Sequence, residues 1–417
     1  MMRFDQFLKK SRAGVIRIEK MTHDEAAIKG KSYFGEWLYI LALVLFIGLT
    51  LLDAKTALSE ILPSWLFSAG RYVCLALMLA KILICRDYRH YNRSAFFRIV
   101  LALIVCGTTT VVSGSRLPIQ YLIVIIAAYG ISFNHIVKSV LISEALMATA
   151  VMLASLLGLI PNDFHIRAST GEIRYNLGFS FATYPAILTY YLSTLYLFVR
   201  KEKIRLLECI VIIALNALLF ILTDTKTELI MTICAVLGFV LLKYKSDAVC
   251  KALRLLSIWM MPVLTVFGVV LAIGYQGDNP VHRELNSALS GRVALAHKAM
   301  DEYGITPFGN DIEWIDLNTI ETEGLDSSEH NVVDIGYLHI LYNYGLVFLV
   351  AFILIYTKTL LFFLERGEPY SVLLIVIMAM HMFITPQMIQ IVYNVTLVLL
   401  VRALIPNGKE EHDFATF

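Results

Sequence analysis

Charged residues are scarce in this sequence. Only 16% of its 417 residues are Asp, Glu, Lys or Arg, whereas 58% are hydrophobic and the mean hydropathy is +0.71. A soluble domain carries about 25% charged residues, so the composition excludes an ordinary soluble protein. Apolar runs of roughly 20 residues recur along the chain, as in membrane-spanning helices, which satisfy their backbone hydrogen bonds internally. We therefore predict an all-α polytopic membrane protein.

Motifs for nucleotide and metal chemistry are also absent. The chain has no P-loop, no glycine-rich dinucleotide fingerprint, no zinc-type Cys/His spacing and no His-Glu-x-x-His motif. The six cysteines lie in apolar runs or at their ends, which does not indicate a disulfide framework. We therefore expect no cofactor, no metal ion and no nucleic-acid partner.

The apolar runs predict about twelve transmembrane helices. One sizeable polar segment, residues 276–333, separates the ninth run from the tenth, and we expect it to form a large extracytoplasmic loop. The predicted spans are residues 37–52, 66–85, 96–112, 118–133, 139–160, 178–199, 206–222, 228–244, 255–275, 335–357, 370–385 and 388–405.

The distribution of positive charge predicts the orientation. If the amino terminus lies inside, 26 of the 35 Lys and Arg residues fall on the cytoplasmic side, as the positive-inside rule requires. Both termini are then cytoplasmic and the long loop faces outward. The predicted division is a cytoplasmic segment 1–36, nine spans in 37–275, the outer loop 276–333, three spans in 334–405 and a cytoplasmic tail 406–417.

Arg292 is the first candidate for chemistry in the outer loop. Residues 289–304 are predicted to form a helix that ends at Gly304, with Ser287 or Ser290 as its cap. Helical spacing places Arg292 on an apolar stripe, where an unpaired charge is costly. Its planar guanidinium suits a phosphate. The same position also fits a structural ion pair with a loop carboxylate such as Asp311 or Glu313.

His330 and Asp334 precede the tenth predicted span. They are four residues apart, so they share a face if this stretch is helical. A His/Asp pair at the mouth of a span could deprotonate a hydroxyl group. A solvated histidine followed by an acidic residue at a helix start fits the spacing equally well.

Several further cations are predicted on the outer side. Lys226 lies in a short turn between two spans, Arg71 and Arg116 lie at span ends, and Arg167 and Arg174 follow the fifth span. Singly, such residues are usually interfacial and extend toward water. Gathered around one outer cavity, they would suit a polyanionic lipid head group such as a pyrophosphate.

Three local motifs within this layout resemble the Wzy-type O-antigen and capsular polysaccharide polymerases, which are related in fold to the O-antigen ligases. They are Ser290-Gly-Arg292 with Pro307-Phe-Gly309, Asp334-Ile-Gly-Tyr-Leu338 with Tyr344-Gly345, and Thr223-Asp-Thr-Lys226-Thr. Two positions depart from the family pattern. Lys226 stands where the family usually has arginine, and His330-Asn331 lies four residues before the position where the ligases have His-Asn.

The resemblance implies transfer between two undecaprenyl-pyrophosphate-linked glycans at the outer face of a bacterial cytoplasmic membrane, without a metal. Arg292 would hold the pyrophosphate, and Asp334 or His330 would orient or deprotonate the acceptor hydroxyl. A chain-length regulator is a candidate further partner. The residues expected to help bind the substrates are Lys226, Arg116, Arg71, Lys298 and Tyr337.

Three other functions remain open at this level. A flippase or transporter for the same lipid-linked oligosaccharide also suits twelve spans, although transporter sites usually lie at mid-membrane on broken helices. A ligase would share the fold and the pyrophosphate site. A non-enzymatic membrane scaffold would leave Arg292 without an explanation.

Overall fold

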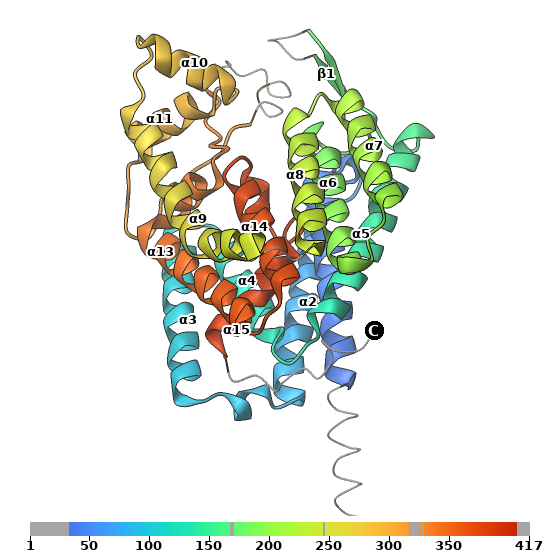
Figure 1. Ribbon diagram of the computed structural model, residues 1–417, viewed down its shortest axis with the longest axis vertical. Coiled ribbons are helices and arrows are strands. Elements are labelled where there is room, and N and C mark those ends of the chain that lie inside the picture. The colour runs from blue at the N-terminus through green and yellow to red at the C-terminus, as the bar shows by residue number, and fades with distance from the viewer. Residues whose placement is uncertain are drawn as a thin grey trace, which may run out of the picture.

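The structure, a computed structural model, describes residues 33–166, 171–244, 247–316, 320, 326 and 329–406. In these ranges the chain forms a bundle of long and short helices with one two-stranded antiparallel hairpin (Figure 1). In the hairpin, β1 (Phe164–Ile166) pairs with β2 (Ile173–Tyr175), with His165 opposite Arg174.

The α-helices follow the predicted runs in order. They are Tyr33–Lys55, α2 (Ser64–Ile84), α3 (Arg93–Ser113), α4 (Leu117–Ala127), α5 (Phe133–Leu156), α6 (Thr183–Arg200), α7 (Leu206–Thr223), α8 (Lys226–Lys243), α9 (Asp247–Gly274), α10 (Pro280–Ala288), α11 (Arg292–Tyr303), α13 (Gly336–Glu365), α14 (Pro369–Met382) and α15 (Val401–Leu404). Short 3-10 helices are η1 (Ala57–Glu60), η2 (Asp87–His90), η3 (Lys201–Lys203), η5 (Pro386–Ile389) and η6 (Val395–Leu400).

Seven of the described helices are long and apolar enough to cross a membrane: Tyr33–Lys55, α2, α3, α5, α7, α9 and α13. Large apolar side chains on their outer faces are exposed, including Val111 at 83% and Ile221 at 72%. Such a surface would be unfavourable in water but is suited to lipid. The prediction of an all-α polytopic membrane protein is therefore confirmed.

The C-terminal part of the chain forms the centre of the bundle. Most of α14 is buried, as is nearly every residue from Ile391 to Ile405. Around this centre, α9 packs on α13 and α14, while α6 packs on α5, α7 and α8. The helices with the most exposed apolar surface thus surround a core built largely from the last two predicted spans.

The twelfth predicted span, 388–405, is not one continuous helix. It consists of η5, a turn, η6 and the single turn α15. Two tyrosines from other helices accept hydrogen bonds from backbone amides at the break. The Tyr121 hydroxyl accepts from the Ile391 amide, and the Tyr191 hydroxyl accepts from the Val395 amide, both at 3.2 Å. The Asn394 amide group donates to the Met388 carbonyl at 2.9 Å. Hydropathy did not reveal this break, because the segment is mostly apolar despite Gln390, Asn394 and Arg402.

Helix α13 is also interrupted, at Gly345, whose φ of 84° and ψ of 171° are not helical. The segment 305–310 fits into the break. The amides of Leu346 and Val347 donate to the carbonyls of Thr306 (2.9 Å) and Pro307 (3.0 Å), and the Asn310 amide donates to Tyr342 (3.1 Å). Segment 305–310 thus provides hydrogen-bond partners for backbone groups at the break in α13.

Lys81 joins three elements at the end of the bundle opposite α11. Its ammonium group is 2.7 Å from Asp87 and donates to the carbonyls of Ala127 (3.0 Å) and Tyr129 (2.6 Å), while the side chain is only 2% exposed. Removing one partner of a buried ion pair leaves an uncompensated charge. We expect Asp87→Asn to lower the free energy of unfolding by about 3 kcal/mol, measured by thermal unfolding in detergent.

The exposed pair His135–Glu36 is the control for this prediction. Its atoms are equally close, at 2.7 Å, but the His135 side chain is 51% exposed. Glu36→Gln should change the unfolding free energy by less than about 1 kcal/mol. Equal effects of the two substitutions would contradict a special role for the Lys81 pair.

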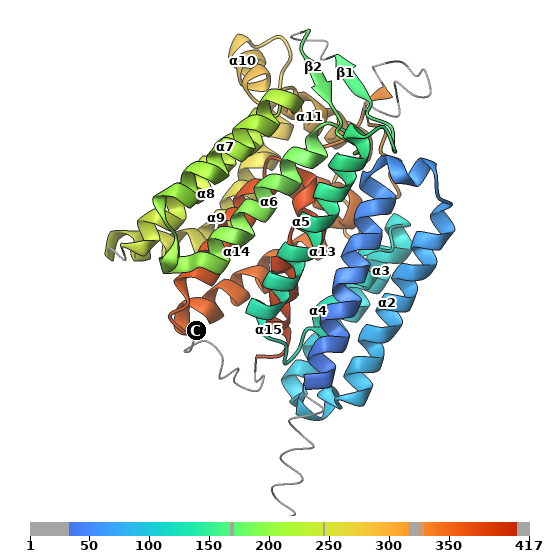
Figure 2. The ribbon, with the colours of Figure 1, turned by 90° about the vertical axis from the view of Figure 1, so that its right-hand side faces the viewer.

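The polar segment after α9 lies at one end of the molecule. Helices α10 and α11 share this end with the β1–β2 hairpin and the turn between α7 and α8, whereas η2 lies at the other end (Figure 2). The connections that the charge distribution assigns to the outer side therefore lie together.

Candidate functional site

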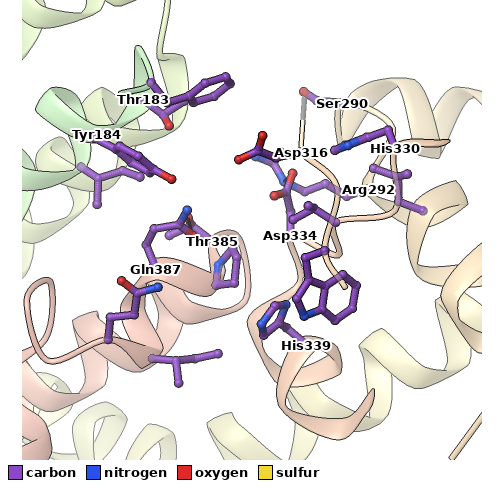
Figure 3. A pocket seen from close by; sticks show the side chains of 18 of the residues that line it. Thr183, Tyr184, Ser290, Arg292, Asp316, His330, Asp334, His339, Thr385 and Gln387 are labelled. Carbon is purple, nitrogen blue, oxygen red and sulfur yellow. Dashed lines mark hydrogen bonds and ion pairs between the residues drawn. The ribbon is translucent and has the colours of Figure 1, made fainter. Parts of the chain in front are cut away.

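A cavity of about 1280 Å³ opens between the connections at this end. Its walls combine the starts of α6, α8, α11 and α13 with the hairpin, the segments 311–316 and 330–334, and residues 385–390. Thr183 and Tyr184 face it from one side, while Arg292, His330 and Asp334 lie together on the opposite side (Figure 3). Four residues that the sequence singled out thus line one cavity: Lys226, Arg292, His330 and Asp334.

Arg292 is the first residue of α11, next to the cavity. The predicted helix ends at Gly304 as expected, but it starts later than predicted and Gly291 is its cap, with φ of 86°. Neither Ser287 nor Ser290 caps it, and Ser290 is itself left-handed, with φ of 56°. This turn aims the Arg292 side chain toward the cavity.

The guanidinium of Arg292 is poorly satisfied within the described structure. Its Nε lies 3.4 Å from Asp334 Oδ2, and its Nη1 donates to the Leu289 carbonyl at 3.4 Å. Strong charge-assisted bonds are about 2.7–2.9 Å long, so both contacts are weak. The carboxylate beside Arg292 is Asp334, and not Asp311 or Glu313, which were named above as examples of a partner. Donors of the guanidinium remain available to an anion.

Asp334 stands against Arg292 just before α13 begins. Burial raises the pKa of this carboxyl above its ordinary value, although Arg292 and His330 act in the opposite direction. The Asp334 side chain is still 39% exposed, so water offsets part of this penalty on the charged form. We interpret Asp334 as the residue that holds the Arg292 side chain in place.

This direction predicts how Asp334 affects stability. A carboxyl whose pKa is higher in the folded state binds its proton more tightly there, so its contribution is favourable at low pH and is lost as pH rises through the folded pKa. Asp334→Asn, which cannot ionise, should be at least as stable as the wild type at pH 8. The difference should vanish below about pH 3, well under the ordinary Asp pKa of about 3.9, where the carboxyl is protonated in both states. Thermal unfolding across this range is the measurement, and a variant less stable at pH 8 would contradict it.

His330 also lines the cavity, but the stretch that carries it is not the helix considered in the sequence analysis. The stretch 330–335 is extended rather than helical, since α13 begins at Gly336. The Nδ1 of His330 lies 3.0 Å from the Ile315 carbonyl, which orients the ring. With the proton on Nδ1, the second ring nitrogen is an acceptor.

Asn331 fixes this extended stretch. Its side-chain oxygen accepts from the Ile315 amide at 2.7 Å, and its nitrogen donates to the Glu313 carbonyl (2.9 Å) and the Tyr303 hydroxyl (3.1 Å). The His-Asn pair of the sequence therefore combines a cavity residue with a structural clamp.

The N-termini of α8 and α11 border the same cavity, although the amides of Gly291, Arg292 and Ala294 at the start of α11 are already hydrogen-bonded within the chain. Residues Thr225 to Glu228 begin α8, and Ser290 to Arg292 begin α11, and all of these line it. The N-terminus of a helix carries a partial positive charge and attracts anions. Lys226 adds a full charge at the first of them, as predicted for the short turn.

Carboxylates outnumber the Lys and Arg side chains around the cavity. The cations are Arg174, Lys226 and Arg292, and the carboxylates are Asp224, Glu228, Asp311, Asp316 and Asp334. The expectation of a wall made mainly of cations is therefore too simple. Local positive charge is confined to the two helix starts and to Arg174.

Four predicted binding residues do not line the cavity. Arg71 is paired with Asp53 at 2.6 Å, and Arg116 donates to the Tyr72 hydroxyl at 2.7 Å. Lys298 donates to the His330 carbonyl at 3.2 Å. Tyr337 is fully buried and donates to the Ala379 carbonyl at 2.7 Å. Each of these side chains contacts protein groups elsewhere, and Arg167 lies outside the described residues.

The cavity includes residues that the sequence did not single out. Trp314 and His339 stack with ring centroids 4.7 Å apart, and Tyr184 faces them from α6 (Figure 3). An isolated tryptophan in a polar loop was the one available signal. Arg174, noted only as one of several outer cations, donates to the Thr223 carbonyl at 2.8 Å and so ties the hairpin to the end of α7.

Comparison with known proteins gives no family. A scan against protein-family models, a search of curated proteins and a search of solved structures each found no match.

Proposed function

We propose that this protein polymerises lipid-linked oligosaccharide repeat units into a surface polysaccharide at the outer face of the cytoplasmic membrane. The observation that carries the proposal is the under-bonded Arg292 guanidinium in a large cavity, beside the N-terminus of α11. Such a group suits a diphosphate, which can accept two parallel hydrogen bonds from one guanidinium. The motif resemblance gives the substrate class, undecaprenyl-pyrophosphate-linked glycans.

In the proposed reaction, a sugar hydroxyl of the acceptor attacks the anomeric carbon of the donor. The new glycosidic bond forms as the bond from that carbon to the pyrophosphate oxygen breaks, and the lipid diphosphate leaves with the electron pair. Arg292, Lys226 and the starts of α8 and α11 stabilise the negative charge that develops on the leaving group. His330 orients the attacking hydroxyl, and Asp334 holds Arg292.

The proposal includes a full membrane topology. The described helices and helical segments occupy all twelve predicted spans, including the shorter α4, α14 and the interrupted segment 388–405. We propose twelve crossings, both termini in the cytoplasm of a bacterium and the cavity at the outer leaflet. This arrangement supports access for two lipid-linked substrates from the membrane and for their glycans from water.

A deletion strain tests the function. Without the protein, single lipid-linked repeat units should accumulate on the outer side and long polysaccharide should disappear. Gel analysis of surface polysaccharide, with labelling of lipid-linked units by an impermeant reagent, measures both. Long chains that persist but remain attached to lipid would instead indicate a ligase.

One observation favours transport as a second candidate. Segment 386–400 is a broken helix in the core of the bundle, and discontinuous helices frequently build transporter sites. In that case the deletion strain should accumulate repeat units on the cytoplasmic side, so the same labelling experiment separates the two functions.

A further inference from the structure

Glu228 stands out among the carboxylates of the cavity. It lies in the first turn of α8, two residues after Lys226, and its residue is only 5% exposed although it lines the cavity. A carboxylate is costly to bury unless a partner compensates its charge. The cations proposed to bind the leaving group do not explain why Glu228 is buried at this position.

The partner is a histidine from another helix. His381 of α14 is 0% exposed, and its Nε2 lies 3.7 Å from Glu228 Oε1. The edge of the imidazole contacts the Tyr190 ring, with centroids 4.4 Å apart.

Both groups keep unused hydrogen-bonding capacity. Glu228 Oε2 and the two ring nitrogens of His381 have no hydrogen-bond partner in the described part of the chain. The separation of 3.7 Å exceeds a normal hydrogen bond but closes with a small side-chain rotation. Apolar residues would be cheaper at both positions if packing were their only role.

The pair is also electrostatically connected with the proposed leaving-group site. Charge on Glu228 raises the pKa of Asp334, the residue that contacts Arg292. Asp334 is occupied by Arg292, whereas Glu228 has no cation other than a protonated His381 within 4 Å in the described structure. Glu228, unlike Asp334, is therefore placed to receive a proton while Arg292 holds the diphosphate.

We propose that Glu228 takes the proton of the attacking acceptor hydroxyl and that His381 is its positioning residue. The inference rests on the proposed function and assigns its proton acceptor. As the acceptor oxygen bonds to the anomeric carbon, its proton passes to a Glu228 oxygen and the lipid diphosphate departs with the electron pair of the broken bond. An Nε2–H of His381 that donates to Oε1 fixes the orientation of the carboxylate before transfer.

The test uses the full-length protein in lipid nanodiscs. The substrate is the lipid-linked repeat unit purified from the deletion strain. Glu228→Gln, which keeps the shape but cannot take a proton, should lower kcat by about 100-fold or more while KM changes less than about twofold. His381→Asn should lower kcat by roughly 10-fold.

Formate rescue distinguishes a base from a structural residue. Glu228→Ala leaves room for a small carboxylate beside the cavity, so added formate should restore part of the lost kcat. A misfolded variant would not respond to formate. Glu144→Gln is the matched control, because Glu144 is also fully buried in a helix but does not line the cavity, and its kcat should equal that of the wild type.

The outcomes separate this inference from the proposed function. If the wild type forms no polymer from the purified repeat unit, the proposed function fails. If the wild type polymerises and Glu228→Gln keeps its kcat, only the assignment of Glu228 fails. Loss of kcat in His330→Asn with full activity in both Glu228 variants would identify His330 as the proton acceptor and overturn the inference.

Discussion

Arg292→Ala should abolish long polysaccharide while the protein is still inserted in the membrane. The guanidinium is the one cavity cation that combines an under-bonded fork with a helix N-terminus, and its loss removes charge stabilisation at the leaving group. Removing a single preorganised group of this kind typically costs about 10²–10³ in rate. Gel analysis of polysaccharide chain length in the complemented deletion strain is the measurement. Arg292→Lys should recover only part of the activity, since an ammonium group cannot bind two phosphate oxygens in parallel.

Arg116→Ala is the control for this result. Arg116 is also an outer-side arginine, but its guanidinium is bonded to Tyr72 and does not line the cavity. Chain length should therefore be unchanged, although the sequence alone placed Arg116 among the binding residues. Normal polymer in Arg292→Ala, or equal losses in both variants, would show that the cavity position of Arg292 has no special role.

Gly345→Ala should prevent the protein from folding stably. At φ of 84° a Cβ atom is strained, and here it would also overlap the Gly309 amide nitrogen and lie 2.6 Å from the Phe308 carbonyl carbon. Neither contact can relax by moving a side chain, because both are backbone. We expect a loss of more than about 5 kcal/mol, at the upper limit for single substitutions. Thermal unfolding in detergent and the yield of monodisperse protein measure it.

Gly130→Ala is the control for Gly345→Ala, because it introduces backbone strain without atomic overlap. Gly130 has a similar φ of 74°, but a Cβ atom there meets nothing within 4 Å. Its cost should be limited to the backbone term of about 1–3 kcal/mol. Similar yields and unfolding temperatures for the two variants would mean that the contact between segment 305–310 and the break in α13 is not essential.

The motif glycines could be recognised in the sequence but not explained there. Gly309 and Gly345 belong to two different motifs, and nothing in their spacing reveals that their backbones touch. Both segments require glycine, because a Cβ atom on Gly345 would overlap the Gly309 amide nitrogen, and a Cβ atom on Gly309 would overlap the backbone of Asn343 and Tyr344. No feature of the sequence indicates that segment 305–310 fits into the break in α13.

The site was predictable in part. Lys226, Arg292, His330 and Asp334 were identified by charge in otherwise apolar or loop surroundings, and they line one cavity. Arg71, Arg116, Lys298 and Tyr337 were selected by the same criteria and lie outside it. Charge and position relative to a span show which end of the membrane a residue occupies, but not the direction of its side chain.

The amino-acid sequence by itself determined the class of this protein, the positions of most of its membrane helices and the polar segment after the ninth, because hydropathy and charge act locally along the chain. Only the tertiary structure decided the pairing of Arg292 with Asp334, the pairing of Glu228 with His381 and the breaks in α13 and in segment 386–400. These features depend on contacts between residues far apart in the chain. Such contacts form where the ends of several helices pack together, and no local sequence pattern predicts which helix ends do so.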